Sequence, residues 1–367
     1  MQTSKIKDVS AFLESLAPQH LQESYDNSGL LTGNPDTTVS GVLVTLDCTE
    51  AVIAEAIDLN CNLIVSHHPI IFKGIKKLTG QTYVERTIIA AVKNDIAIYA
   101  AHTNLDNVHH GVNKKIADKL GLKNTRVLAP RKGTLSKLVT FVPKEHLNAV
   151  LHVLYAAGAG QIGMYKNCSF QVSGTGTFEP NSAAKPFIGK PGQQETVEEV
   201  RIELILPTHE ENKILNALRK EHPYEEVAYY LTHVENEDQD IGAGLLGELE
   251  TPEEPIQFLQ RLKKQMNVSV VRYTPFTNKM LNKVALCGGA GSFLLPQAIA
   301  QGADVFVSAD FKYHEFFDAE GRILIADIGH YESEQFTKEL LLEVLSKKFS
   351  TFAINFSKTV TNPISYF

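Results

Sequence analysis

The sequence has no tryptophan and only four cysteines among its 367 residues. Cys48, Cys61, Cys168 and Cys287 are far apart in the chain and form no C-x-x-C pair. That excludes a zinc ribbon and disfavours a disulfide-built scaffold. No run approaches the roughly 18 uninterrupted apolar residues of a membrane helix, and the first residues lack the apolar stretch of a secretory signal. A reducing, cytoplasmic location without a membrane partner is therefore expected.

The chain also lacks an excess of basic residues. Lys and Arg number 35 against 42 Asp and Glu, which gives a net charge of −7. Because nucleic-acid binders carry a broad basic surface, the composition disfavours DNA or RNA as a partner. Hydrophobic residues make up 43% and charged residues 21%, close to the globular average. At about 100–200 residues per domain, the length predicts two or three domains.

The first part of the chain alternates strand-like and helical segments. Three apolar runs, at 40–47, 62–66 and 96–101, are separated by helical patterns at 49–60 and 82–95. Strands that are continuously apolar, rather than alternating, are typical of a parallel sheet covered on both faces. The sequence therefore predicts an α/β fold with βαβ connections in this region.

The pattern changes near residue 124. The segment 137–159 has the order strand, turn and helix, and 197–235 repeats this order and adds a strand. The stretches LVTFVPKEHL and IELILPTHEENKIL are similar enough to be an internal repeat. Two such β-turn-α halves predict a small ferredoxin-like α+β domain, which ends at a polar, Gly-rich linker at 236–244.

After the linker, the α/β pattern resumes. A strand at 323–329 leads into one long helix predicted at 331–349. We therefore expect a three-layer α/β core domain built from two halves, residues 1–128 and 238–367. The ferredoxin-like domain, residues 129–237, interrupts it.

Polar side chains follow three of the predicted strands at the point where each strand ends. In open α/β sheets, ligand sites lie beyond the carboxyl ends of the strands, so these side chains are expected at one functional edge. A histidine and a glutamate after the last strand are four residues apart at a helix start, and therefore share a helix face. The residues concerned are His67, His68, His102, Asp106, His330 and Glu334.

Imidazoles and carboxylates without thiolates are ligands that suit Zn, Mn, Fe, Co or Ni. Five or six such groups exceed the needs of one tetrahedral ion, and a bridging carboxylate can hold two ions about 3.5–4 Å apart. We expect two divalent ions per chain, with zinc first and Glu334 as the bridge. Taken singly, each cluster is equally well explained as a polar strand end, a capped turn or a solvated helix face. Only their combination favours a metal site.

Two further segments suggest additional roles. Gly288 and Gly289 lie in the sequence GGAGS between a strand and a helix, where backbone N–H groups can contact phosphate. A tight strand–helix turn explains the same sequence equally well or better. Lys312 would be another phosphate contact. His314 and His102 are candidates for proton transfer, although His314 could equally be a surface residue.

In combination, these motifs resemble those of the GTP cyclohydrolase I type 2 homologues, also called NGG-interacting-factor-like proteins. The resemblance covers essentially all of both outer segments, with one departure, because Tyr25 stands where the family has Trp. The matching pieces, in family order, are YDNSGLLTG, LDCTEAVIAEAI, NLIVSHHPIIFKGIK, AAHTNLDNVHHGVN, GAGLLGEL, CGGAGS, SADFKYHE and ADIGHYESEQF.

The resemblance implies a metal-binding α/β fold with a dinuclear site, and His102 matches a further position of that site. It also implies a homohexamer, a toroidal trimer of dimers whose metal sites face an internal cavity, and an inserted domain of the PII/CutA type. The family name implies opening of the guanine imidazole ring of GTP with release of formate. The implied metal ligands are His67, His68, Asp106, His330 and Glu334.

Two functions of different classes follow from these expectations. The first is a metal-dependent hydrolase acting on a nucleotide such as GTP, or on a different substrate. It predicts an open coordination position and nearby phosphate donors. The second is a non-enzymatic, metal-binding or regulatory hexameric assembly. It predicts that the ligands serve assembly or metal handling without turnover.

Overall fold

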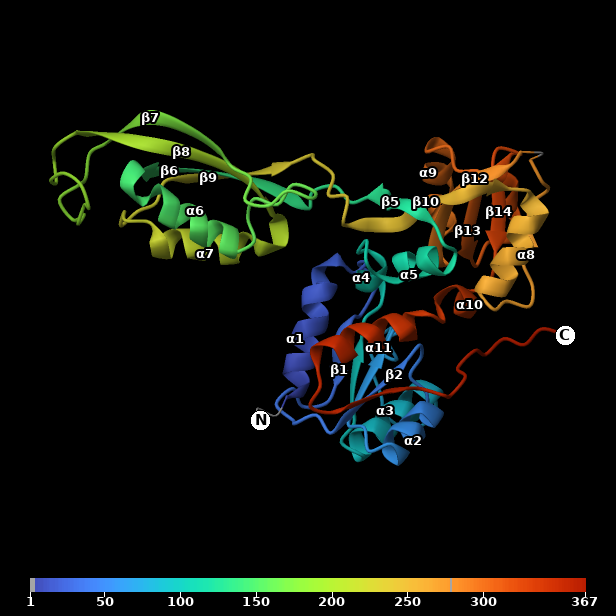
Figure 1. Cartoon of the computed structure of the whole chain (residues 1–367). Helices are drawn as coiled ribbons and strands as arrows, with labels where there is room; N and C mark the ends of the chain where they lie inside the picture. The colour runs from blue at the N-terminus through green and yellow to red at the C-terminus, as the bar shows by residue number, and fades with distance from the viewer. Residues whose placement is uncertain (1–3, 278) are drawn as a thin grey trace. The chain divides into compact units, whose positions relative to one another are not determined.

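The computed structural model describes residues 4–277 and 279–367. The chain divides into two compact units (Figure 1). One unit comprises the chain up to Ala129 and from Asp240 onward, and the other comprises Pro130–Gln239. Within the described residues, no helix combines the length and apolar character needed to cross a membrane.

The larger unit contains two separate sheets, of which the first has five strands. Four of them run parallel, and the antiparallel β1 forms one edge. In spatial order they are β1 (Gly29–Thr32), β4 (Ala97–Ala100), β3 (Leu63–Ser66), β2 (Gly41–Thr45) and β15 (Ala353–Phe356).

Both faces of this first sheet are buried, as its continuously apolar strands predict. In β3, Leu63 and Val65 belong to the core cluster on one face, and Ile64 belongs to the cluster on the other. The helices α2 (Glu50–Asp58) and α3 (Tyr83–Lys93) pack into the second cluster. Each of these helices begins after a threonine whose hydroxyl oxygen accepts a backbone N–H of the first turn, which caps it.

The second sheet has six strands, of which β12, β13 and β14 run parallel. One of its strands, β10, begins inside the linker that the sequence predicted at 236–244, because its pairing partner β12 is distant in the chain. In spatial order the strands are β11 (Arg272–Tyr273), β14 (Leu324–Asp327), β13 (Val305–Ala309), β12 (Leu281–Ala290), β10 (Gly242–Glu253) and β5 (Lys123–Pro130).

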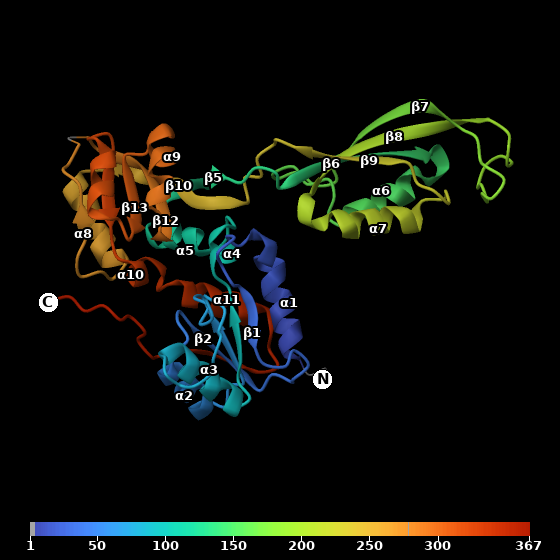
Figure 2. The same cartoon turned by 180° about the vertical axis from the view of Figure 1, so that it is seen from behind.

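Helices fill the space between the two sheets, where α5, α10 and α11 lie (Figures 1 and 2), and one core cluster includes residues of both sheets. The remaining helices of this unit lie around the sheets. Besides α2 and α3, the helices of this unit in chain order are α1 (Ile6–Leu16), η1 (Gln19–Leu21), α4 (Thr103–Asp106), α5 (Val112–Lys119), α8 (Pro255–Gln265), η4 (Ser292–Leu294), α9 (Leu295–Ala300), η5 (Tyr313–Ala319), α10 (His330–Glu334) and α11 (Thr337–Lys348).

The prediction of one long helix at 331–349 is wrong, because the chain forms α10 and α11 instead. The side-chain amide of Gln335 donates to the carbonyl oxygens of Glu332 and Met266. A side chain thus satisfies a carbonyl at the end of α10 that a continuous helix would pair with its own backbone. The short α10 still keeps His330 and Glu334 on one face.

The smaller unit has one antiparallel sheet, in the order β7-β8-β6-β9, with both helices packed on one face. Its chain order β-α-β-β-α-β, with this strand order, is the ferredoxin-like arrangement. Its elements are β6 (Leu135–Pro143), η2 (Lys144–His146), α6 (Leu147–Ala156), β7 (Phe170–Phe178), β8 (Glu195–Pro207), η3 (Thr208–Glu210), α7 (Glu211–Glu221) and β9 (Tyr229–Val234).

Candidate metal centre

The carboxyl ends of the parallel strands of both sheets meet at one cavity of about 530 Å³. From the first sheet, Asp47 follows β2, His68 follows β3 and His102 follows β4. From the second sheet, Gly288 lies near the end of β12 and His330 follows β14. All five residues line the cavity. These positions agree with the expectation that polar residues at the strand ends lie close together.

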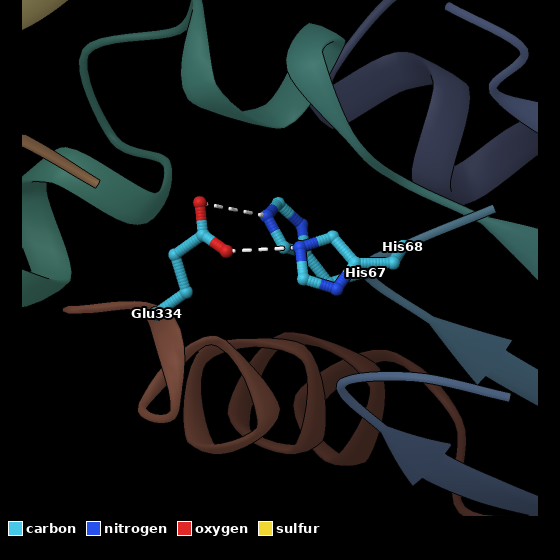
Figure 3. Close-up of side chains that lie close together, drawn as sticks. All are labelled: His67, His68 and Glu334. Atoms are coloured by element: carbon cyan, nitrogen blue, oxygen red, sulfur yellow. Dashed lines mark hydrogen bonds and ion pairs between the residues drawn. The ribbon is translucent and has the colours of Figure 1, made fainter. Parts of the chain in front are cut away.

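Glu334 lies at the centre of this group and is only 3% exposed. Its Oε1 lies 3.7 Å from Nε2 of His67, and its Oε2 lies 2.9 Å from Nε2 of His68 and 3.2 Å from Nε2 of His330. Figure 3 shows the two carboxylate oxygens directed at the two adjacent histidines. Asp106 Oδ1 is 3.8 Å from Nε2 of His67. The two oxygens of Glu334 therefore face two different sets of ligand atoms.

The histidines of the site are all held through Nδ1. In each case Nδ1 lies 2.7 Å from an oxygen that accepts its hydrogen, so Nε2 is the atom turned toward the centre. Nε2 of His330 and Nε2 of His68 come within 3.4 Å of each other. The four Nδ1 contacts are His67 to the Ala101 carbonyl, His68 to Asp47, His102 to Asp26 and His330 to Asp310.

Two buried atoms of the site have no hydrogen-bond partner, Nε2 of His67 and Oδ1 of Asp106. Leaving such a polar atom unsatisfied costs about 1–3 kcal/mol. The ligand atoms of His67, His68 and Glu334 all lie within 4.8 Å of one another, close enough for one metal ion. A divalent cation of the kind that imidazole and carboxylate ligands bind would satisfy the unpaired atoms, so the residues present fit a metal.

The electrostatics of the cluster also favour added positive charge. Burial lowers the pKa of His68, but hydrogen bonds to Asp47 and Glu334 outweigh it and raise the pKa to about 10. The same balance with its own carboxylate partners raises the pKa of His330 to about 11. Desolvation and the charge of Glu334 raise the pKa of Asp106 to about 8. Burial opposes ionisation of Glu334, yet the surrounding imidazoles hold its pKa well below the usual value.

The two glycines predicted as phosphate contacts have another role in the structure. A Cβ on Gly289, whose φ is +61°, would lie 2.4 Å from Oε1 of Glu334. The N–H of Gly288 donates to Oδ1 of Asn113, and that of Gly289 donates to Oγ of Ser333, each at 2.9 Å. The glycines thus let the end of β12 approach Glu334, and neither N–H is free for a phosphate.

Lys312 and His314 do not lie at the cavity. Both are exposed, and neither is among the residues that line it. The backbone N–H of Lys312 donates to Oε2 of Glu315 at 2.8 Å. His102, the other residue considered for proton transfer, does line the cavity, and its ring centroid lies 5.4 Å from that of His68.

Three aspartates of the site were missed in the sequence. Asp47 follows β2 and Asp310 directly follows β13, so the rule that identified the histidines at strand ends would have found both. Asp26 lies before β1, in a segment rich in Gly and Asn, and no strand precedes it in the described part of the chain. Its carboxylate accepts from His102, and also from the N–H and the hydroxyl of Thr103, a pairing that no local pattern reveals.

The chain is similar to known proteins along nearly its whole length. The family model Duf34/NIF3 (NGG1p interacting factor 3) matches residues 4–363. A protein of Halalkalibacterium halodurans named GTP cyclohydrolase 1 type 2 homolog is 40% identical over 373 residues, covering 100% of both chains. A Bacillus subtilis protein of the same name is 39% identical over 366 residues, covering 98% of each.

The likeness extends to a solved structure. The crystal structure of a Bacillus cereus protein related to NIF3 superimposes with a TM-score of 0.88 at 38% identity, covering 100% of both chains. Sequence, fold and length therefore agree from end to end. The chain belongs to the Duf34/NIF3 (NGG1p interacting factor 3) family.

Proposed function

We propose that this protein is a metal-dependent hydrolase with a centre for two divalent ions. The observation that carries the proposal is the placement of Glu334, whose two carboxylate oxygens face different sets of ligand atoms. His67, Asp106 and Oε1 of Glu334 would hold one ion. His68, His330 and Oε2 of Glu334 would hold the other.

Ions held by these residues would lower the pKa of a water molecule toward neutrality and would polarise a substrate group. The chain itself supplies orientation and proton transfer. Asp47 and Asp310 fix the rings of His68 and His330 through Nδ1. His102 lines the cavity with its Nδ1 held by Asp26. Its Nε2 is therefore the atom placed to accept or donate a proton.

The relatives' name, GTP cyclohydrolase 1 type 2 homolog, gives the first reaction to test. Opening of the guanine imidazole ring of GTP would release formate, which can be measured directly. The experiment incubates GTP with protein loaded with Zn, Mn, Fe or Co, beside Glu334→Ala and the control Glu320→Gln, whose side chain is exposed.

We expect formate release by the parent and by Glu320→Gln, and none by Glu334→Ala. Equal release by Glu334→Ala would refute the site. Two ions per chain without turnover of GTP or any other hydrolysable substrate would refute the hydrolase proposal, and would favour a metal-binding or regulatory assembly instead.

We also propose that the protein assembles as a homohexamer and that its smaller unit is a PII/CutA-like domain. The β-α-β-β-α-β order and strand order of Pro130–Gln239 support a PII/CutA-like domain. The toroidal homohexamer is proposed from the family resemblance. Light scattering coupled to gel filtration tests it, because a hexamer has six times the chain mass and a dimer or trimer would contradict it.

A further inference from the structure

Exposed aromatic side chains lie at the cavity of the candidate metal centre. Tyr25 is 62% exposed, Phe72 is 45% exposed and Phe293 is 63% exposed, and all three line the cavity. Isolated apolar side chains at a surface are ordinary, but a group of them around a concave site with a few polar groups is typical of ligand binding. The three rings therefore indicate that the molecule bound in the cavity has an apolar or aromatic part.

The rings continue inward to the candidate ligands. The ring centroids of Tyr25 and Phe72 are 6.1 Å apart, and those of Phe72 and His102 are also 6.1 Å apart. His102 is 5.4 Å from His68, whose Nε2 contacts Glu334. Neighbouring rings at these separations form one continuous aromatic wall from the exposed residues to the metal ligands. The rings of Phe72 and His102 are inclined to each other by 71°, so a planar molecule would stack on an outer ring, Tyr25 or Phe72, with its edge toward the centre.

The charge of the cavity is acidic. Among the described residues that line it, there is no lysine and no arginine, whereas four carboxylates do line it: Glu23, Asp47, Asp106 and Glu334. Two divalent ions would offset four carboxylate charges and leave no excess of positive charge. The cavity therefore lacks the cationic side chains that hold polyphosphates in other proteins.

Backbone donors do not replace the missing cations. The N–H groups of Gly288 and Gly289 are engaged by Asn113 and Ser333. The two helices that begin beside the ligands, α4 and α10, have only four and five residues, too few to build up the dipole of a long helix. Apart from the proposed ions, a triphosphate would thus lose its hydration here without gaining matching partners from the chain.

We propose that this site prefers an uncharged, planar heteroaromatic molecule of the size of a nucleobase or nucleoside, held by stacking on the wall of Tyr25 and Phe72, and that it binds the triphosphate of the same molecule more weakly. This inference rests on the proposed function, because it names the substrate class of that metal centre. The cavity of about 530 Å³ is large enough for such a molecule.

The test is calorimetric titration of the zinc-loaded full chain with guanosine, guanosine monophosphate and GTP. We expect guanosine to bind most tightly, with affinity falling as phosphates are added and GTP at least about tenfold weaker than guanosine, because like charges repel. Tyr25→Ala should weaken guanosine at least about fivefold, the low end for one lost stacking contact. Tyr83→Ala is the matched control, because Tyr83 is 59% exposed but does not line the cavity.

Zinc content, measured after each titration, separates this inference from the proposed function. GTP binding as tight as guanosine overturns the inference. So does the absence of binding by all three probes to protein that retains two zinc ions. Tyr25→Ala that changes the oligomeric state but not guanosine affinity also overturns it, by placing the aromatic wall at a subunit interface. Protein that takes up no zinc refutes the proposed function, and the inference falls with it.

Discussion

The two units of this chain treat buried polar side chains differently. In Pro130–Gln239, Ser136, Thr140 and His222 are buried, and each is hydrogen-bonded within the unit. Among the described residues, every buried side-chain polar atom without a hydrogen bond lies in the other unit. Two of them, on His67 and Asp106, face each other at 3.8 Å.

Polar groups that support a fold are satisfied by the chain itself, whereas a pair of unsatisfied groups facing each other needs something from outside the chain. The smaller unit is stabilised without a ligand by a continuous apolar cluster between its sheet and its helices. The larger unit carries, at the strand ends, a group of imidazole and carboxylate ligand atoms, two of which, Nε2 of His67 and Oδ1 of Asp106, have no hydrogen-bond partner. Binding of a metal ion should therefore change the stability of the larger unit and leave the stability of the smaller unit unchanged.

The largest effect should come from Glu334→Ala. Because Glu334 faces both sets of ligand atoms, its loss should lower the metal content from two ions per chain to one or none, with the fold retained. Elemental analysis and far-ultraviolet circular dichroism check this, beside Glu320→Gln. Equal metal content in Glu334→Ala and the parent would remove the bridging role.

Leu218→Ala tests whether the smaller unit can be destabilised without loss of metal from the larger unit. Leu218, in α7, is fully buried and packs in the apolar cluster of the smaller unit. Its truncation should cost about 2–5 kcal/mol, seen as faster hydrogen exchange in 130–239, with two metal ions still bound. Ile162→Ala, at an exposed position of the same unit, should have little effect. Loss of metal in Leu218→Ala would show that the two units do not respond separately.

The sequence predicted the parts of the fold that have a strong local pattern. The apolar runs at 40–47, 62–66 and 96–101 are found as β2, β3 and β4. The strand β1 was not predicted, because its four residues, Gly29–Thr32, lie in a segment rich in Gly and Asn. It exists through antiparallel pairing with β4, which is distant in the chain. Strand formation that depends on such pairing leaves little trace in local composition.

The site was predictable to a similar degree. His67, His68, His102 and His330 were found because polar residues at strand ends stand out against apolar strands. For Gly289 the sequence left open a phosphate contact or a tight strand–helix turn, because a glycine-rich turn allows both, and in the structure it allows close packing against Glu334. The sequence shows that a side chain is absent at this position, but not which atom occupies the space.

Asp310→Asn should moderately lower the metal affinity of the larger unit and leave the smaller unit unchanged. Oδ2 of Asp310 accepts the Nδ1 hydrogen of His330 at 2.7 Å, and removing the charge of such a partner typically weakens metal binding about 10–100-fold. Asparagine tolerates the left-handed φ of +57° at this position. Competition with a chelator measures the affinity, and Asp318→Asn, at an exposed position, is the control. Unchanged affinity would mean that the ring of His330 is held by other contacts.

The smallest effect should come from the C-terminal segment. Oγ1 of Thr361 donates to Oδ2 of Asp47 at 2.5 Å, and Oδ1 of Asp47 accepts from Nδ1 of His68 at 2.7 Å. Thr361→Val removes one hydrogen bond to a carboxylate, of a kind worth about 1.5–3 kcal/mol, but it leaves the bond between Asp47 and His68 in place, so metal affinity should fall only about 2–10-fold through a less firmly held His68.

A control on the same segment separates orientation of His68 from docking of the C-terminal chain. Thr359 also donates a hydroxyl hydrogen to a carboxylate, but that carboxylate belongs to Glu55 in α2. Thr359→Val should therefore loosen the segment without weakening metal binding. Chelator competition on both variants decides between the two roles. Equal losses of affinity would mean that the segment acts by covering the site rather than by fixing Asp47.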